Sequence, residues 1–272
     1  MAERDRLDKI LHSQGYFPSR SKAKRAIMAG MVYVNGQQVD KAGTQVCTDD
    51  NFEVRGDENP FVSRGGLKLA RALDVFSVDP EGQEVIDVGA STGGFTDCLL
   101  QAGASKVYAI DVGYGQLAWK IRQDERVEVI EKTNFRHLTP EELEVQVPLI
   151  VIDVSFISLR LIIPAALEFL TEGGEIIALI KPQFEAGKER VGNRGLVKDR
   201  KVHIDVLEEL MSFFQQQKLT IAGLDFSPIT GASSKNIEFL VHLKKMGTEN
   251  NENNLDQQIR ATVQAAHRKL EN

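Results

Sequence analysis

The chain has 272 residues, which is room for one large domain and one small one. Apolar residues make up 42% of it and charged residues 26%, both ordinary values for a globular protein with a normal core. The net charge of −6 argues against a protein that coats nucleic acid through its overall charge, so any such contact has to use local basic patches.

Cysteine content and hydropathy narrow the class of protein further. Cys47 and Cys98 are far apart and lack metal-ligand spacing, which excludes a disulfide framework and favours a reducing compartment. The charged first residues are not followed by an apolar segment, and no stretch approaches the roughly 18 apolar residues that cross a bilayer. The sequence therefore predicts a cytoplasmic protein with no membrane partner and no metal.

Residues 1–58 are predicted to form a small α+β domain. Leu7, Ile10 and Leu11 make a helical stripe, and a second helix begins after Ser19, a suitable N-cap. The dipeptide Asn-Gly at 35–36 predicts a hairpin turn, and residues 52–54 a further short strand. The expected order is helix, helix, hairpin.

The second predicted helix carries a run of cations that could lie across a phosphate backbone. Over residues 1–60, nine lysines and arginines equal nine acidic residues, so a solvated helix face is the alternative. The segments Ser-Arg-Ser-Lys-Ala and Gly-Met-Val-Tyr-Val-Asn-Gly resemble a small RNA-binding domain, the S-four type, in which the second helix meets RNA. We therefore favour RNA binding by Arg20, Lys22, Lys24 and Arg25.

A polar linker at 59–61 precedes a second predicted domain over 62–246. Apolar runs alternate with helical patterns there, which predicts an α/β fold with a mostly parallel sheet and helices on both faces. The runs at 107–110, 149–152 and 176–180 each end just before a reactive side chain. Because ligands bind at the carboxyl ends of such strands, Asp111, Asp153 and Lys181 are expected to share one crevice.

The first apolar run, 85–88, leads into a glycine-rich loop. This loop lacks the third glycine of a dinucleotide fingerprint and the Gly-Lys-Ser/Thr of a phosphate loop. Its backbone can approach a ligand closely, Asp87 can accept from the ammonium of S-adenosyl-L-methionine, and Asp111 from a ribose diol. A tight strand–helix turn is the alternative. The predicted cofactor-binding residues are Asp87, Gly89, Ala90, Ser91, Thr92, Gly93, Gly94, Phe95, Asp111, Asn134 and Asp153.

Asn134 has two open interpretations. An amide after the predicted strand at 127–130 can contact adenine, or it can cap a helix over 139–142.

Four motifs, at 63–69, 87–95, 152–158 and 179–185, together resemble the TlyA-type proteins. That family joins an S-four-type domain to an FtsJ-like ribose 2′-O-methyltransferase with a Rossmann-like fold. The resemblance implies methyl transfer from S-adenosyl-L-methionine to a ribose of ribosomal RNA, with cytidine as the expected nucleotide, and some members of the family carry a hemolysin label. It also implies a catalytic tetrad of Lys68, Asp153, Lys181 and Glu238.

The chemistry of the tetrad fits this reaction. A ribose hydroxyl is a poor nucleophile and needs a partner that takes its proton. Burial and the charge of Lys68 are expected to disfavour the ammonium form of Lys181, and Asp153 and Glu238 are expected to orient the two lysines. Which of the two lysines is the neutral base stays open. In the loop after Lys181, a second set of cations is predicted to touch RNA phosphates, with a solvated loop as the alternative: Lys188, Arg190 and Arg194.

Two other functions remain as alternatives. One is an RNA-binding ribosome-assembly factor with an inactive methyltransferase fold, and the other, ranked last, is a hemolysin-like membrane-active protein.

The asparagine-rich segment 247–254 is predicted to be a disordered linker, and 255–272 a terminal helix. The target nucleotide, the choice between ribosomal subunits or naked RNA, and the oligomeric state stay open.

Overall fold

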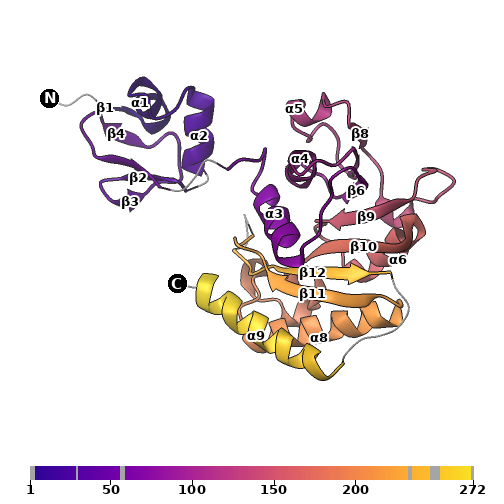
Figure 1. Ribbon diagram of the computed structural model, residues 1–272. Helices are drawn as coiled ribbons and strands as arrows, with labels where there is room; N and C mark the ends of the chain where they lie inside the picture. Colours follow the sequence, from indigo (N-terminus) through magenta and orange to yellow (C-terminus); the bar gives the residue numbers. More distant parts are fainter. Residues whose placement is uncertain (1–3, 29, 56–58, 232–234, 246–251, 271–272) are drawn as a thin grey trace. The chain divides into compact units, whose positions relative to one another are not determined.

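The computed structural model describes residues 4–28, 30–55, 59–231, 235–245 and 252–270. The chain forms two compact units that divide between Pro60 and Phe61, within the linker expected at 59–61 (Figure 1).

The first unit packs two helices against short antiparallel strands. Its three-stranded sheet has the order β3-β2-β5, and β1 pairs with β4. The elements are β1 (Arg4–Arg6), α1 (Leu7–Ser13), α2 (Arg20–Met28), β2 (Val32–Val34), β3 (Gln37–Gln38), β4 (Gln45–Cys47) and β5 (Phe52–Val54).

Local sequence signals explain this unit. The Ser19 hydroxyl accepts a hydrogen bond from the Lys22 backbone N–H at 3.2 Å, as expected of the N-cap of α2. Asn35 and Gly36 both have positive φ (51° and 79°), which gives a hairpin turn that matches the twist of β2 and β3. The predicted order of helix, helix and hairpin is confirmed, whereas β1 and β4 were not predicted. The apolar helix faces close over a small core that includes Leu7, Leu11, Ala23, Ile27, Val32 and Phe52.

The second unit is built on a seven-stranded sheet of order β11-β12-β10-β9-β6-β7-β8. The five strands from β10 to β8 are parallel, and β12 runs antiparallel to both of its neighbours, β10 and β11. β11 and β12 lie together at one end of the sheet, with β11 as the edge strand. The bounds are β6 (Glu84–Val88), β7 (Lys106–Ile110), β8 (Val127–Ile130), β9 (Val147–Ile152), β10 (Leu170–Ile180), β11 (Thr220–Phe226) and β12 (Phe239–Lys244).

Helices cover both faces of this sheet, as the α/β prediction requires. In β9, Ile150 and Ile152 join the core under α6, α8 and α9, whereas Leu149 and Val151 join the core under α3, α4 and α5. This alternation follows from the two-residue period of a strand. The helices are α3 (Gly65–Phe76), α4 (Gly94–Gln101), α5 (Trp119–Arg122), α6 (Leu159–Phe169), α7 (Pro182–Glu185), α8 (Arg200–Gln216) and α9 (Glu252–Leu270), with short 3-10 turns η1 (Phe135–His137), η2 (Lys188–Arg190) and η3 (Asn193–Gly195).

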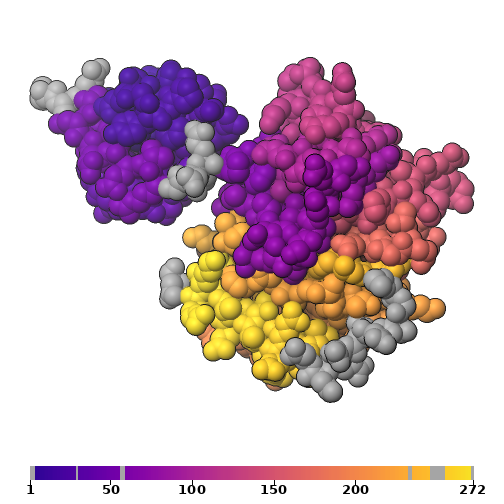
Figure 2. Space-filling view, viewed as in Figure 1, coloured from indigo at the N-terminus to yellow at the C-terminus, as the bar shows by residue number. Residues whose placement is uncertain are grey.

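The terminal helix belongs to the core of the second unit. It begins at Glu252, three residues before the expected start at 255, while residues 247–251 of the expected disordered segment lie outside the described residues. Ile259, Val263 and Ala266 are buried against α8 and β11, and in Figure 2 the yellow atoms of α9 lie flat on the orange atoms beside them. Neither α9 nor any other helix within the described ranges is long and apolar enough to cross a bilayer.

Gly89, just beyond β6, sets the geometry at the carboxyl ends of the central strands. Its φ is +86°, and a Cβ atom there would lie 2.7 Å from the carbonyl oxygen of Asp153. The Gly89 N–H also donates to the Ile110 carbonyl at 2.8 Å, and the Asp153 N–H to the Val88 carbonyl at 3.0 Å. The ends of β6, β7 and β9 are therefore held together through backbone atoms.

Replacing Gly89 by alanine should destabilise the protein for two reasons. A left-handed alanine costs about 1–2 kcal/mol, and relief of the overlap with the Asp153 carbonyl should add roughly 1–3 kcal/mol. Chemical unfolding of Gly89→Ala measures the sum. Gly82→Ala is the matched control, because Gly82 also has positive φ (+69°) but a Cβ atom there would have no neighbour within 4 Å. Equal losses in the two variants would contradict the steric argument.

Candidate active site

A pocket opens where the carboxyl ends of β6, β9 and β10 meet the start of α3. Three of the four predicted tetrad residues line it together with part of the glycine-rich loop. Its wall consists of Ser63, Arg64, Gly65, Lys68, Gly89, Ala90, Ser91, Gly94, Phe95, Asp153, Ser155 and Lys181.

The tetrad forms two ion pairs. Lys181 Nζ lies 2.6 Å from Asp153 Oδ1 and donates to the Ser155 hydroxyl at 2.8 Å. Lys68 Nζ donates to Glu238 Oε2 at 2.6 Å. Each lysine is only 8% exposed, and Glu238 is 3% exposed. Because burying an unpaired charge is costly, the carboxylates fix where the two ammonium groups lie.

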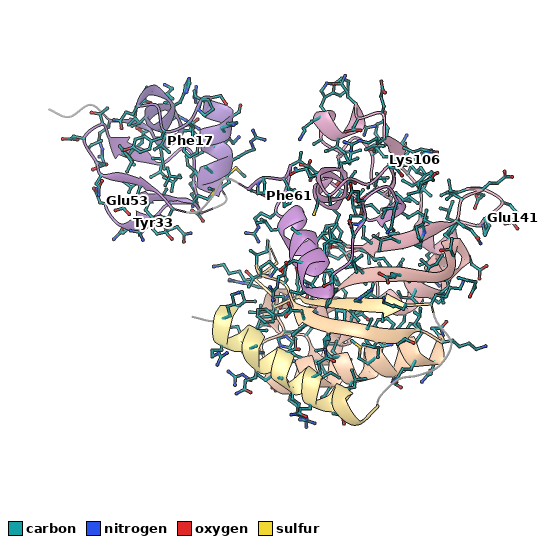
Figure 3. All side chains as sticks on the ribbon, in the orientation of Figure 1. Phe17, Tyr33, Glu53, Phe61, Lys106 and Glu141 are labelled. Carbon is teal, nitrogen blue, oxygen red and sulfur yellow. The ribbon has the colours of Figure 1, made fainter. Side chains whose placement is uncertain are left out.

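The start of α3 places Lys68 in this pocket. Phe61 is the first residue of the second unit, and its side chain lies beside the beginning of α3 (Figure 3). A Cβ atom at Gly66 would come within 2.2 Å of the Phe61 ring, so only glycine lets the helix approach so closely. One helical turn separates Gly65 from Lys68.

Ser155, Ser63 and Arg64 line the pocket but were not predicted as site residues. Ser155 follows Asp153 by two residues in the segment after β9, and its hydroxyl accepts from Lys181. The sequence did offer a signal for Ser155, because polar residues that follow a strand end are candidates for a ligand site. Ser63 and Arg64 belong to the motif at 63–69, but nothing in their residue type showed that they face the pocket.

Asp87 is a fully buried carboxyl with an unsatisfied oxygen. Its Oδ2 accepts from the Thr96 hydroxyl at 2.6 Å, whereas Oδ1 has no donor among the described residues. Burial raises the pKa of Asp87 to about 7, and the charges of Asp153 and Asp111 add to the effect while the Thr96 hydrogen bond opposes it. A cationic ligand group near this carboxyl would favour its ionised form, which fits the ammonium of S-adenosylmethionine.

Asp111 ties the loops around the same end of the sheet. Its two oxygens accept from the backbone N–H groups of Ser91, at 2.7 Å, and Gly113, at 2.6 Å. A carboxylate has about four lone-pair sites, so these bonds leave acceptor capacity for a diol. Thr92 and Gly93 lie in the same loop but do not line the pocket.

Asn134 acts as a helix cap. Its side-chain oxygen accepts from the Arg136 backbone N–H at 3.2 Å, at the start of η1. The helix expected over 139–142 is wrong, since those residues form turns and the short helix ends at His137. Asn134 is exposed, so its cap role leaves the amide nitrogen open to a ligand.

The predicted RNA-contacting cations fall into two groups. Arg190 is engaged within the protein, because its guanidinium pairs with both oxygens of Glu209, at 2.9 and 3.2 Å, and donates to the Ala186 carbonyl at 2.6 Å. Arg20 pairs with Asp8 at 2.7 Å but keeps a half-exposed side chain. The others are exposed: Lys22, Lys24 and Arg25 on α2, and Lys188 and Arg194 on η2 and η3.

Two family models match the chain, one for each unit. The FtsJ-like methyltransferase family matches residues 61–245, and the S4 domain matches residues 5–52. These ranges follow the division of the structure at Pro60 and Phe61.

Individual relatives cover nearly the whole chain. The candidate rRNA methyltransferase YqxC of Bacillus subtilis is 50% identical over 99% of this chain and 96% of its own. The 16S/23S rRNA (cytidine-2′-O)-methyltransferase TlyA of Mycobacterium tuberculosis is 42% identical over 90% of this chain and 91% of its own. The solved structure of a candidate hemolysin from Streptococcus thermophilus is 45% identical, with a TM-score of 0.78, and the match covers 100% of this chain and 98% of that one.

The comparisons and the structure agree. Two domains match in the order seen in the chain, TlyA is identical at 42% of positions over most of both chains, and the methyltransferase unit has a pocket beside the glycine-rich loop and the two lysine–carboxylate pairs. The chain belongs to the TlyA-type family of FtsJ-like methyltransferases, with an S4 domain ahead of the methyltransferase domain.

Proposed function

We propose that this protein transfers a methyl group from S-adenosylmethionine to the ribose 2′-hydroxyl of a cytidine in ribosomal RNA. The observation that carries the proposal is the presence of both lysine–carboxylate pairs at one pocket with the glycine-rich loop. The names of the relatives supply the substrate class, because TlyA of M. tuberculosis is named as a 16S/23S rRNA (cytidine-2′-O)-methyltransferase.

The glycine-rich loop and its neighbours are suited to the cofactor. The unsatisfied oxygen and raised pKa of Asp87 fit a nearby ammonium, and Asp111 keeps acceptor capacity for the ribose hydroxyls. The loop from Gly89 to Gly94 offers backbone rather than bulky side chains to the ligand. When bound, S-adenosylmethionine supplies a sulfonium methyl group that is electrophilic without a metal.

Lys181 is the residue that we assign to the hydroxyl proton. Its Nζ already lies between two acceptors, Asp153 and Ser155, so a deprotonated Lys181 would keep its remaining N–H bonds directed at them. The nitrogen lone pair would then be available to the ribose hydroxyl. Asp153 and Ser155 thereby orient the base, and the reaction gains most from holding the hydroxyl oxygen in line with the methyl group.

Lys68 and Glu238 provide a fixed charge pair beside the reacting atoms. The pair is buried and comes from α3 and the residue before β12, so its position depends on the packing of two distant parts of the sequence. Lys68 lines the pocket, and its ammonium can stabilise negative charge that develops on the attacking oxygen.

Lys181→Ala should lower methyl transfer by about 10²–10⁴-fold, the usual worth of a general base, with cofactor affinity retained. The measurement is transfer of radiolabelled methyl to ribosomal RNA, as intact subunits and as naked RNA, from a strain that lacks the enzyme. Lys201→Ala removes an exposed lysine of α8 and should keep full activity. A fully active Lys181→Ala enzyme would remove this mechanism, and an inactive parent that binds cofactor would favour an assembly factor.

Cofactor affinity should depend on pH through Asp87. Because the cofactor ammonium favours the carboxylate, affinity should be full above the Asp87 pKa of about 7 and weaken by up to about tenfold per pH unit below it. The raised pKa of Asp87 also affects the stability of the free protein. Protonated Asp87 stabilises the folded state at low pH, and this stabilisation is lost as the pH rises through about 7. Calorimetric titration with S-adenosylhomocysteine, which keeps the ammonium, measures the affinity.

Asp87→Asn is the control for that titration. It keeps an oxygen for the Thr96 hydroxyl but does not ionise, so its affinity should be weaker and independent of pH. A parent enzyme whose affinity is flat between about pH 5.5 and pH 8 would show that Asp87 does not meet the ammonium.

The two arginines after Lys181 should behave differently. Arg194→Ala should weaken RNA binding. It should also lower the slope of log affinity against log salt by about one, the change expected when one phosphate contact is lost. Arg190→Ala should leave that slope unchanged and lower stability by up to about 1 kcal/mol, because it breaks a partly exposed pair with Glu209. Filter binding and thermal unfolding give the two readouts. An equal loss of slope in both variants would place Arg190 on the RNA as well.

A further inference from the structure

The charges at the pocket do not balance. Three cationic side chains line it, and two of them are neutralised by a carboxylate: Lys181 by Asp153 and Lys68 by Glu238. The third cation is Arg64, which has no carboxylate within ion-pair distance among the described residues. The pocket therefore carries one positive charge that the protein itself does not offset.

Arg64 is anchored but unsatisfied. Its Nη2 donates to the backbone carbonyl of Thr230 at 2.6 Å, which fixes the direction of the side chain. Its Nε is buried and finds no acceptor in the described part of the chain. A guanidinium has five N–H donors in a planar fork that suits two oxygens of a phosphate or a carboxylate. A held guanidinium with donors to spare in a pocket wall is suited to an anionic ligand group.

The sheet order indicates which ligand supplies that anion. The cofactor residues follow β6 and β7, on one side of the tetrad, whereas Thr230 lies in the connection between β11 and β12, on the other side. Asp153 and Lys181, at the ends of β9 and β10, stand between the two. The guanidinium of Arg64 therefore extends toward the half of the site that remains for the nucleotide.

We propose that Arg64 binds a phosphate that flanks the target ribose and so positions the 2′-hydroxyl at Lys181. The inference rests on the proposed function, since it assumes an RNA strand in the pocket. The phosphodiesters on either side of a ribose are the only anions that every RNA substrate brings to this place, whatever its sequence. A contact of this kind sets register and orientation without reading the base.

Two substitutions separate a phosphate contact from a structural role. Arg64→Gln keeps an N–H donor for the Thr230 carbonyl but removes the charge, whereas Arg64→Lys keeps the charge. Arg71→Gln is the matched control, because Arg71 lies two turns further along α3 and pairs with Asp225 on β11, outside the pocket wall. Thermal unfolding of each variant checks that the fold is kept.

The binding experiment uses naked ribosomal RNA from a strain that lacks the enzyme, with S-adenosylhomocysteine present and salt varied between about 50 and 200 mM. Arg64→Gln should lower the slope of log affinity against log salt by about 0.7–1, and Arg64→Lys should keep it. Under single-turnover conditions, Arg64→Gln should need about tenfold more RNA for half-maximal rate, with cofactor affinity unchanged. Arg71→Gln should match the parent in every readout.

Three outcomes would overturn the proposal. The first is an Arg64→Gln variant with the parent's salt slope, and the second is an Arg64→Lys variant as impaired as Arg64→Gln, which would indicate a role in holding Thr230. The third is a loss of cofactor affinity in Arg64→Gln with RNA affinity intact, which would assign the guanidinium to the cofactor carboxylate. Because the salt slope needs no turnover, a parent that binds RNA without methylating it would refute the proposed function and still test Arg64.

Discussion

The backbone contact between Gly89 and Asp153 is the constraint on which the rest of the site depends. Parallel strands β6 and β9 bring these residues to the same edge of the sheet, and the absence of a side chain at Gly89 lets the loop meet the carbonyl of Asp153. That contact fixes the separation between the proposed cofactor loop and the carboxylate that holds Lys181. Methyl transfer needs a donor and an acceptor at a defined distance, so a rigid backbone contact between their two supports is what the reaction requires.

The two lysine–carboxylate pairs make the pocket nearly neutral and strongly ordered. Buried ion pairs add little net stability, since desolvation offsets much of their attraction. Their value here is geometric: each ammonium nitrogen has one position that satisfies it. Against that neutral background the single charge of Arg64 acts without competition, because no carboxylate in the described chain draws it away from a ligand.

The division of the chain separates two physical tasks. The S4 unit presents exposed cations on α2 and has a core of its own, and it is the unit that we propose to hold RNA. Within the catalytic unit, the same residue type does different work according to its partners. Arg190 closes a pair with Glu209, Arg64 faces the pocket, and Arg194 stays exposed at a 3-10 turn.

Local sequence patterns were enough to predict the mostly parallel sheet, the strand ends that carry Asp111, Asp153 and Lys181, and the hairpin and N-cap of the first unit. These features follow from local periodicity, turn residues and apolar runs, which act over a few neighbours. Resemblance of four motifs then predicted the tetrad. One of these motifs ends in Glu185, which accepts from the Ser158 hydroxyl and the Leu159 N–H and so caps α6. Packing across the fold settles that Lys68 pairs with Glu238 and Arg190 with Glu209, and it leaves Arg64 without a carboxylate among the described residues. Each of these depends on which charges meet across the fold, and pairing between distant residues leaves no local pattern in a single sequence.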